Sequence, residues 1–206
     1  MKNILCRIKR DNKLNFLSTE GKLISDLWFD EVWGFKNGYA RVKINDKWNL
    51  IDTDCKIVFN QWFDRVYDFE NGFAMVKLND KWNFINNNEE LLCNQWFDDA
   101  WSFHNSFASV KLNDKWNFIN TKGEIINDQW FDDVWNFKNG YARVQINNKE
   151  NLLDTNGKLL SKEWFNHIHD FIDGFAMVTL NGKWNFINTA GEIISEQWFD
   201  DISYHI

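Results

Sequence analysis

The 206-residue sequence contains no proline, only three cysteines and no long apolar run. No stretch approaches the ~20 apolar residues needed to cross a bilayer, so no membrane-spanning helix is expected. Basic residues are in the minority, with 23 Lys and Arg against 30 Asp and Glu and a net charge of −7. Nucleic acids and anionic membranes are bound by net-basic surfaces, so direct binding to either is not expected.

The cysteines argue against a disulfide-stabilised secreted domain. Cys6, Cys55 and Cys93 are an odd number without motif spacing, which is typical of a reducing cytosol. The first 13 residues place charges on both sides of a short apolar stretch and contain no cleavage site, so no signal peptide is predicted. We therefore expect a cytoplasmic protein.

Aromatic residues are abundant, at 17% of the chain with 13 Trp and 19 Phe, which excludes disorder. They recur with a period of 34 residues and no insertion. The period predicts one repeat domain over residues 1–206, with units at approximately 3–34, 35–68, 69–102, 103–136, 137–170 and 171–206. A lysine and a Trp-Phe pair mark the units, the lysines being Lys13, Lys47, Lys81, Lys115, Lys149 and Lys183 and the pairs beginning at Trp28, Trp62, Trp96, Trp130, Trp164 and Trp198.

The local pattern is that of strands rather than helices. Residues 40–44 (ARVKI) are apolar at every second position, which indicates a half-buried strand. Asn45 and Asp46 follow as a two-residue linker that tolerates the positive φ of a tight hairpin, and a second strand is predicted at the equivalent of residues 82–85. The sequence therefore predicts an all-β fold of short antiparallel strands.

The rest of each unit reads as two further extended segments. Gly123 is expected to supply a left-handed turn position before a short third strand at residues 124–126. Residues 130–135 (WFDDVW) are predicted as a fourth extended piece, and Asn139-Gly140 closes the unit. The tryptophans are expected to pack between successive units.

Residues 115–126, 130–134 and 137–144 resemble the bacterial WG repeat family, which carries a Trp-Gly pair, a Gly-Lys-apolar turn, an aromatic-Asp motif and a Phe-x-x-Gly-x-Ala segment. The resemblance implies a β-rich repeat fold and no single activity. The proline usual before the aromatic-Asp motif is absent. Asparagine replaces the glycine of Trp-Gly, as expected of a residue that tolerates left-handed geometry, at Asn49, Asn83, Asn117, Asn151 and Asn185.

Two arrangements of the units are considered. Arg10 and Leu14 make the first unit more polar and smaller, which suits the end of an open, superhelical or solenoid-like array. A closed six-unit ring or propeller-like toroid would instead bury both terminal edges. A three-unit super-period favours the ring, because residues 36–42 (KNGYARV) recur at 138–144. We predict the open array.

One strand position varies in chemistry from unit to unit while its neighbours stay constant. A tuned binding face would show this pattern, and so would neutral drift. Lysines two residues further on form a basic ladder, for which a solvated, charge-separated surface is predicted. The predicted binding residues are Arg41, Met75, Ser109, Arg143 and Met177.

Carboxylate and histidine motifs were considered as metal sites. The side chains of Asp132 and Asp133 would point to opposite faces, so we expect the first Asp to hydrogen-bond a turn or the next unit. His167 and His169 would share a face, with Asp170 and His205 as possible further ligands. Drift of this unit from the repeat is the preferred reading, and no metal or other cofactor is predicted.

No sequence signature of an enzyme is found: there is no Gly-x-Ser-x-Gly, phosphate-binding glycine loop or His-Glu-x-x-His. The sequence therefore predicts a non-enzymatic protein-interaction module. Its partner could be a nucleic-acid-handling enzyme, because an acidic protein can occupy a basic cleft. The alternative is a small-ligand or carbohydrate binder that stacks its ligand on exposed Trp and Tyr.

Overall fold

A computed structural model describes residues 4–54 and 56–202, so Cys55 and His205 lie outside the described residues. The chain divides into two compact units, residues 1–103 and 104–206. The described residues contain strands and no helix, which confirms the all-β prediction. The first unit holds β1 (Ile4–Arg10), β2 (Lys13–Ser18), β3 (Glu31–Val32), β4 (Tyr39–Ile44), β5 (Lys47–Asp52), β6 (Arg65–Val66), β7 (Phe73–Leu78), β8 (Lys81–Asn86) and β9 (Asp99–Ala100). The second unit holds β10 (Phe107–Leu112), β11 (Lys115–Asn120), β12 (Asp133–Val134), β13 (Tyr141–Ile146), β14 (Lys149–Asp154), β15 (His167–Ile168), β16 (Phe175–Leu180) and β17 (Lys183–Asn188).

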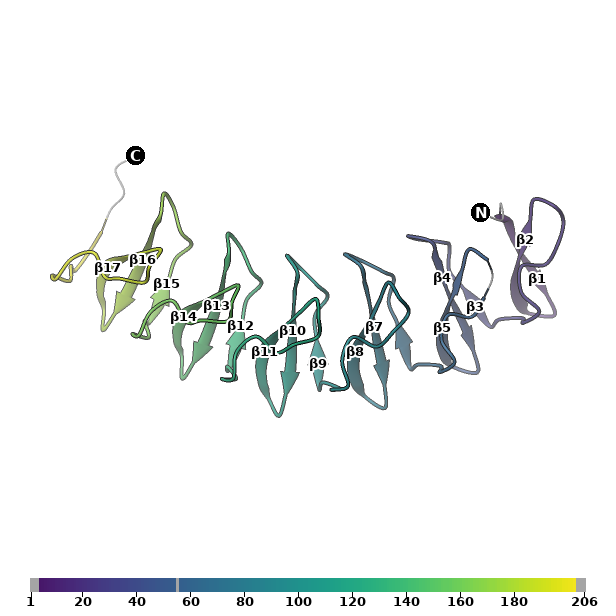
Figure 1. Ribbon diagram of the computed structural model, residues 1–206, viewed down its shortest axis with the longest axis horizontal. Helices are drawn as coiled ribbons and strands as arrows, with labels where there is room; N and C mark the ends of the chain where they lie inside the picture. Colours follow the sequence, from purple (N-terminus) through teal and green to yellow (C-terminus); the bar gives the residue numbers. More distant parts are fainter. Residues whose placement is uncertain (1–3, 55, 203–206) are drawn as a thin grey trace. The chain divides into compact units, whose positions relative to one another are not determined.

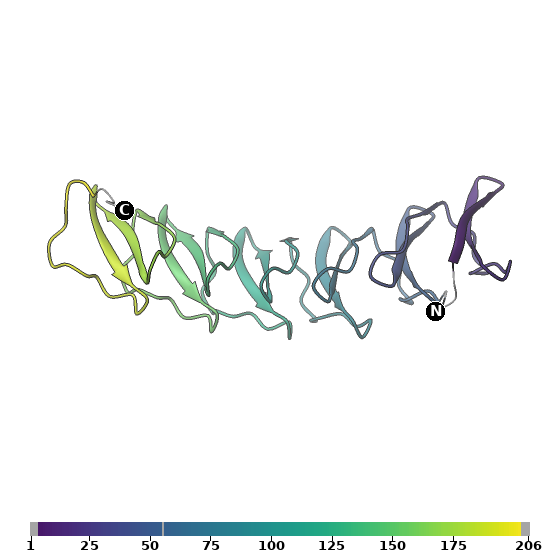
Figure 2. The same cartoon turned by 90° about the horizontal axis from the view of Figure 1, so that it is seen from above.

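Small antiparallel sheets follow one another along each unit (Figure 1). The first unit contains the hairpin β1-β2 and the sheets β3-β4-β5 and β6-β7-β8. The second contains the hairpin β10-β11 and the sheets β12-β13-β14 and β15-β16-β17, whose hairpins lie side by side when the unit is turned (Figure 2). In the part of the chain described, no sheet closes into a barrel. The tandem repeat prediction is confirmed; the choice between an open array and a ring stays a prediction.

The predicted turns are confirmed by their backbone angles. Asn45 and Asp46 have φ of 50° and 62°, as a hairpin turn of the type I′ class requires. Gly123 has φ of 79°, and Asn139 and Gly140 have φ of 51° and 87°. Each of these positions takes the left-handed conformation that Asn, Asp and Gly tolerate best.

The third strand predicted at residues 124–126 is wrong. Only an isolated bridge between Ile119 and Ile125 stands there, with the Ile126 amide donating to the Phe118 oxygen at 3.1 Å. The segment at 130–135, predicted as an extended piece, contains a bridge from Trp116 to Phe131 followed by the strand β12. The chain here runs along the hairpin without a continuous ladder, because side chains hold part of its backbone.

Those side chains are the asparagines of the Trp-Asn pair. Asn117 is buried within β11, and its amide nitrogen donates to the oxygens of Asn127 at 2.7 Å and Gln129 at 3.1 Å. Its side-chain oxygen accepts from the Phe118 amide at 2.8 Å. The expectation that asparagine stands here for left-handed geometry is therefore wrong: these residues adopt strand geometry and serve as hydrogen-bonding clamps. The equivalent contacts from the side-chain nitrogen are made by Asn15, Asn49, Asn83, Asn151 and Asn185.

The core lies between successive repeats. Phe118 of one repeat packs with Phe131, Phe137 and Leu153 in a buried cluster, against which Trp164 also packs. The Asn105 amide ties the preceding turn to the Phe137 oxygen at 2.8 Å. Burial of each repeat thus depends on its neighbour, as expected for repeat proteins.

Candidate functional site

The predicted binding residues occupy the same register position, each in the central strand of its own sheet. Arg41 in β4 pairs with Leu50, and Arg143 in β13 pairs with Leu152. Their neighbours on the opposite face, such as Ala142 and Val144, are fully buried. Each of the five residues therefore lies on the equivalent face of its own strand, as the alternation of a strand requires.

This face is less open than an outward position would be. Arg41, Met75, Arg143 and Met177 are half-buried, and Ser109 is buried at 5% exposure. The reason is that the next repeat covers part of the face: the Tyr141 ring lies 5.1 Å from that of Phe171. The binding role of these positions stays a prediction.

An exposed aromatic residue stands beside the variable position, and the sequence reasoning did not single it out. The amide of Trp33 donates to the Arg41 oxygen, and that of Trp135 to the Arg143 oxygen, each at 2.9 Å. Trp33, Trp101 and Trp135 are 51%, 64% and 40% exposed. The expectation that tryptophans pack between successive repeats is therefore wrong for these three. The same repeat position holds Trp33, Tyr67, Trp101, Trp135 and His169.

In the first unit the aromatic and the variable residue form a closed ion-pair cluster. The Arg41 guanidinium carbon lies 4.2 Å above the centre of the Trp33 ring, a cation–π contact. Arg41 Nε is 2.7 Å from Asp68 Oδ1. Lys36 Nζ is 2.9 Å from Glu70 Oε1 and 3.7 Å from Asp68 Oδ2, and the Glu70 carboxylate raises the pKa of Lys36. Each cation of this cluster therefore has its own carboxylate.

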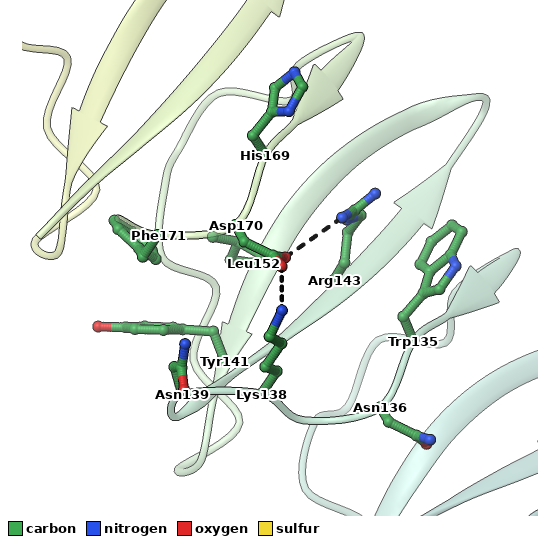
Figure 3. A pocket seen from close by; sticks show the side chains of 10 residues that line it. All are labelled: Trp135, Asn136, Lys138, Asn139, Tyr141, Arg143, Leu152, His169, Asp170 and Phe171. Atoms are coloured by element: carbon green, nitrogen blue, oxygen red, sulfur yellow. Dashed lines mark hydrogen bonds and ion pairs between the residues drawn. The ribbon is translucent and has the colours of Figure 1, made fainter. Parts of the chain in front are cut away.

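The equivalent cluster of the second unit is open and surrounds a cavity of about 210 Å³ (Figure 3). The Arg143 guanidinium carbon is 5.5 Å from the Trp135 ring centre, and Arg143 Nη2 is 3.8 Å from Asp170 Oδ1. Lys138 Nζ pairs with Asp170 Oδ2 at 2.5 Å and holds the pKa of Asp170 below its usual value. The cavity is lined by Trp135, Asn136, Lys138, Asn139, Tyr141, Arg143, Leu152, His169, Asp170 and Phe171.

A buried carboxylate lies behind this cavity, where the other complete repeats have tryptophan. Glu150 Oε2 accepts from the Ile168 amide at 2.9 Å and lies 3.0 Å from His167 Nδ1. It is also 3.8 Å from Arg143 Nη1. The glutamate that replaces tryptophan thus has polar partners within the same repeat. Several residues of this repeat therefore differ together from the repeat pattern.

Among the described residues, no third metal ligand joins the histidine pair. The rings of His167 and His169 meet edge to face at 4.7 Å, and His167 Nδ1 faces Glu150. Burial, followed by the nearby His167 and Arg143, lowers the pKa of His169, whose buried Nε2 has no hydrogen-bond partner. Within residues 4–54 and 56–202, no group of three or more His, Cys, Asp or Glu could hold a metal ion.

The basic ladder is neutralised by local acids. Lys43 Nζ is 2.9 Å from Glu31 and 3.1 Å from Asp46, while Lys77 Nζ is 3.0 Å from Asp80. The same lysines lie over tryptophan rings, Lys77 at 5.5 Å from the centre of Trp82. This geometry agrees with the predicted charge-separated surface.

The first Asp of the Asp132-Asp133 pair hydrogen-bonds a hairpin turn, as predicted. Asp132 Oδ2 accepts from the Asn147 amide at 2.7 Å, and its other oxygen pairs with Lys115. Asn166 keeps the turn contact, accepting from the Asn181 amide at 2.8 Å. Asp133 instead caps the Val134 amide at 2.9 Å, so the two carboxylates have separate roles.

Two further observations bear on chemistry and location. Burial raises the pKa of the Cys93 thiol, which disfavours the reactive thiolate. Among the described residues, no helix is long and apolar enough to cross a membrane.

Comparison with known proteins yields one family match. The family model described as WG containing repeat matches residues 16–48, 50–82, 97–116, 118–149 and 152–184, which is more than half of the chain. No curated protein matches the sequence.

Solved structures are similar only at a low level. Hsv2 from Kluyveromyces lactis is 11% identical with a TM-score of 0.39, over 89% of this chain and 69% of that chain. A protein of unknown function from Bacteroides caccae is 11% identical with a TM-score of 0.30, over 92% and 90%. TM-scores below 0.5 do not establish that two chains share a fold.

Proposed function

Because the chain belongs to the WG containing repeat family, we propose that it is a non-enzymatic protein-interaction module. A repeat array keeps its core constant while one position in each repeat varies, which allows the surface to be adapted to a partner. In this chain the adaptable position is the variable strand residue together with the aromatic residue beside it.

The observation that carries the proposal is the exposure of Trp33, Trp101 and Trp135 at one repeat position. Large aromatic side chains are enriched in protein interfaces and supply most of the binding energy at a few sites. Exposing three of them costs solvation energy, which a partner's surface would recover. We name Trp33, Trp101 and Trp135 the aromatic row, after the repeat position that they share.

The partner is expected to be net basic, because this chain carries a net charge of −7. Opposite net charges accelerate association and suppress incorrect pairings. A nucleic-acid-handling enzyme with a basic cleft fits this description. The row and the net charge together support a protein partner over a free nucleic acid.

The test is copurification from native cells with three tagged versions of the chain. The wild type is compared with the Trp33→Ala/Trp101→Ala/Trp135→Ala variant and with a matched control, Leu23→Ala/Leu91→Ala/Ile193→Ala. The control removes three exposed apolar side chains, 49%, 43% and 38% exposed, from a different repeat position. We expect one stoichiometric protein with the wild type and the control, and its loss with the aromatic variant. Equal recovery from all three, or no partner at all, would contradict the proposal.

Small-ligand or carbohydrate binding is the second candidate, and the same exposed indoles favour it because they offer faces for stacking sugar rings. A glycan and metabolite screen with tryptophan emission as the readout tests it. Acrylamide should quench the fluorescence of the aromatic row, and a bound glycan should reduce this quenching. Quenching unchanged across the screen, together with a protein partner, would exclude this candidate.

A further inference from the structure

The two units contain the same cluster of residues 102 positions apart. Residues 36–42 and 138–144 share the sequence KNGYARV. Trp33 corresponds to Trp135, and Asp68 corresponds to Asp170. In both copies a lysine and an arginine approach the same aspartate, and the arginine lies over the tryptophan.

The copies differ at several positions, among them Trp48 of the first unit, which corresponds to Glu150 of the second. Glu70 of the first unit corresponds to Ile172 of the second, which is 58% exposed. In the first unit Glu70 forms an ion pair with Lys36, and the Asp68 carboxylate lies 2.7 Å from Arg41 Nε. The first cluster therefore has two carboxylates for two cations.

In the second unit one carboxylate is shared. Lys138 forms an ion pair with Asp170 at 2.5 Å. The Arg143 guanidinium lies 3.8 Å from the carboxylates of both Asp170 and Glu150, beyond hydrogen-bonding distance. Glu150 is already used by His167 and by the main chain of Ile168. The second cluster therefore also has two carboxylates, Asp170 and Glu150, but neither lies within hydrogen-bonding distance of Arg143.

We propose that the pocket around Arg143 binds the carboxylate of an acidic side chain from a protein partner. The incoming carboxylate forms a charge-assisted hydrogen bond to the Arg143 guanidinium, which neither Asp170 nor Glu150 makes at 3.8 Å. This inference rests on the proposed protein-interaction function and names the anchor that the partner inserts.

The shape and lining of the pocket fit one side chain. Its volume of about 210 Å³ is below the ~300–1,000 Å³ typical of sites for drug-sized ligands. Figure 3 shows Arg143 and Lys138 on either side of Asp170, with Trp135 flanking Arg143. The aromatic ring and Leu152 can pack the methylene groups of a Glu, while the cations bind its carboxylate.

A single acidic anchor is compatible with a net-basic partner. Net charge acts over the Debye length of about 8–10 Å and controls association rates, whereas the anchor acts at contact distance. The variable position is an arginine at Arg7, Arg41 and Arg143. Of these, Arg143 lines the pocket together with Lys138 and Trp135, which fixes where the anchor binds.

The test uses NMR of the full ¹⁵N-labelled chain. The probes are N-acetyl-glutamate N′-methylamide, its uncharged glutamine counterpart, and sodium glucuronate. We expect the glutamate probe to shift the Arg143 Nε–H and Trp135 indole signals, and the glutamine probe to bind at least about tenfold more weakly. Equal shifts from both amino-acid probes, or no shift at all, would overturn the proposal. Tighter binding of glucuronate at the same signals would reassign the pocket to an acidic sugar and also overturn it.

Two substitutions sharpen the test. Ile172→Glu places at an exposed position the carboxylate that Glu70 provides in the first unit. The new carboxylate should pair with Lys138, leave Asp170 to Arg143 and so abolish binding of the glutamate probe. Glu70→Ile should create a second site that reports at Arg41. If Ile172→Glu leaves binding unchanged, the lack of an acid at position 172 is not what leaves Arg143 available, and the proposal is wrong. Loss of the copurified partner in the aromatic-row variant, with no probe binding at Arg143, would show that this inference fails while the proposed function stands.

Discussion

A Cβ atom added to Gly157 would lie 1.6 Å from the main-chain oxygen of Ile126 in the preceding repeat. Gly157 also has φ of 78°. The Asn127 side chain donates to the Gly157 oxygen at 2.6 Å, which holds the two repeats together at this turn. The glycine is therefore required twice, for its backbone angle and for the close approach of its neighbour.

Gly157→Ala should destabilise the second unit well beyond its backbone strain. Gly21 is a matched control, because it occupies the same repeat position with φ of 75° and has no heavy atom within 4 Å of the added Cβ. Gly21→Ala carries only the left-handed strain, whereas Gly157→Ala adds overpacking, so we expect a difference of about 1–3 kcal/mol in unfolding free energy. Urea denaturation measures both, and equal losses would show that the repeats do not meet as described.

Asn117→Ala should be strongly destabilising. The substitution removes three hydrogen bonds and leaves the oxygens of Asn127 and Gln129 without their amide partner, for an expected loss of about 2–4 kcal/mol. Asn94→Ala, at an exposed asparagine, is the control and should change stability by less than about 0.5 kcal/mol. Thermal and urea unfolding report both. A small loss of stability in Asn117→Ala would mean that the substitution is tolerated and that the Asn117 side chain does not clamp the loop.

Acid should weaken the fold through the Asp–Lys pairs. The Lys47 ammonium and the Asn79 amide lower the pKa of Asp64 below 3.8. Because the folded-state pKa is depressed, the stabilisation is fully present above pH 3.8 and is lost as the pH falls through the lower folded-state value. Asp64→Asn should keep the turn contact, as Asn166 does, while losing less than about 1 kcal/mol at neutral pH and flattening the acid limb of urea midpoint against pH. An unchanged acid limb would count against the pair.

His169 should titrate below pH 6.5. Burial and the positive charges of His167 and Arg143 lower its pKa, against the opposing effect of Glu150 and Asp170. Its contribution to stability is present above pH 6.5 and is lost as the pH falls through the lower folded-state pKa. An NMR titration of the imidazole signal gives the pKa directly. Arg143→Gln should raise it, and a midpoint at or above 6.5 in the wild type would contradict this arrangement.

The backbone of each repeat could be predicted from sequence because its signals are local. Alternation predicted β4, and Asn45-Asp46 predicted the hairpin turn, since both depend only on neighbouring residues. The residues at 124–126 are apolar and look like a strand, but the Asn117 side chain takes part of the backbone pairing that a strand would make. A long-range clamp of this kind leaves no local signal.

The candidate site was predicted in part for the same reason. The shared face of Arg41 and Arg143 follows from the repeat register. Its partial cover by the next repeat does not, because that depends on how repeats stack. The exposure of Trp135 could not be predicted from its residue type, since tryptophan is usually buried. The contrast between Glu70 and Ile172 is visible in the sequence, but it gains meaning only when Lys36 and Lys138 are placed beside them.

Oxidative footprinting of the purified complex tests the central claim most directly. The free chain and the chain with its copurified partner are oxidised in parallel, and the modification of each tryptophan is read by mass spectrometry. The account predicts that Trp33, Trp101 and Trp135 are modified readily in the free chain and become protected in the complex, while half-buried Trp48 and Trp116 change little. Unchanged modification of the aromatic row, with protection elsewhere on the chain, would contradict the proposal that this row is the interaction surface.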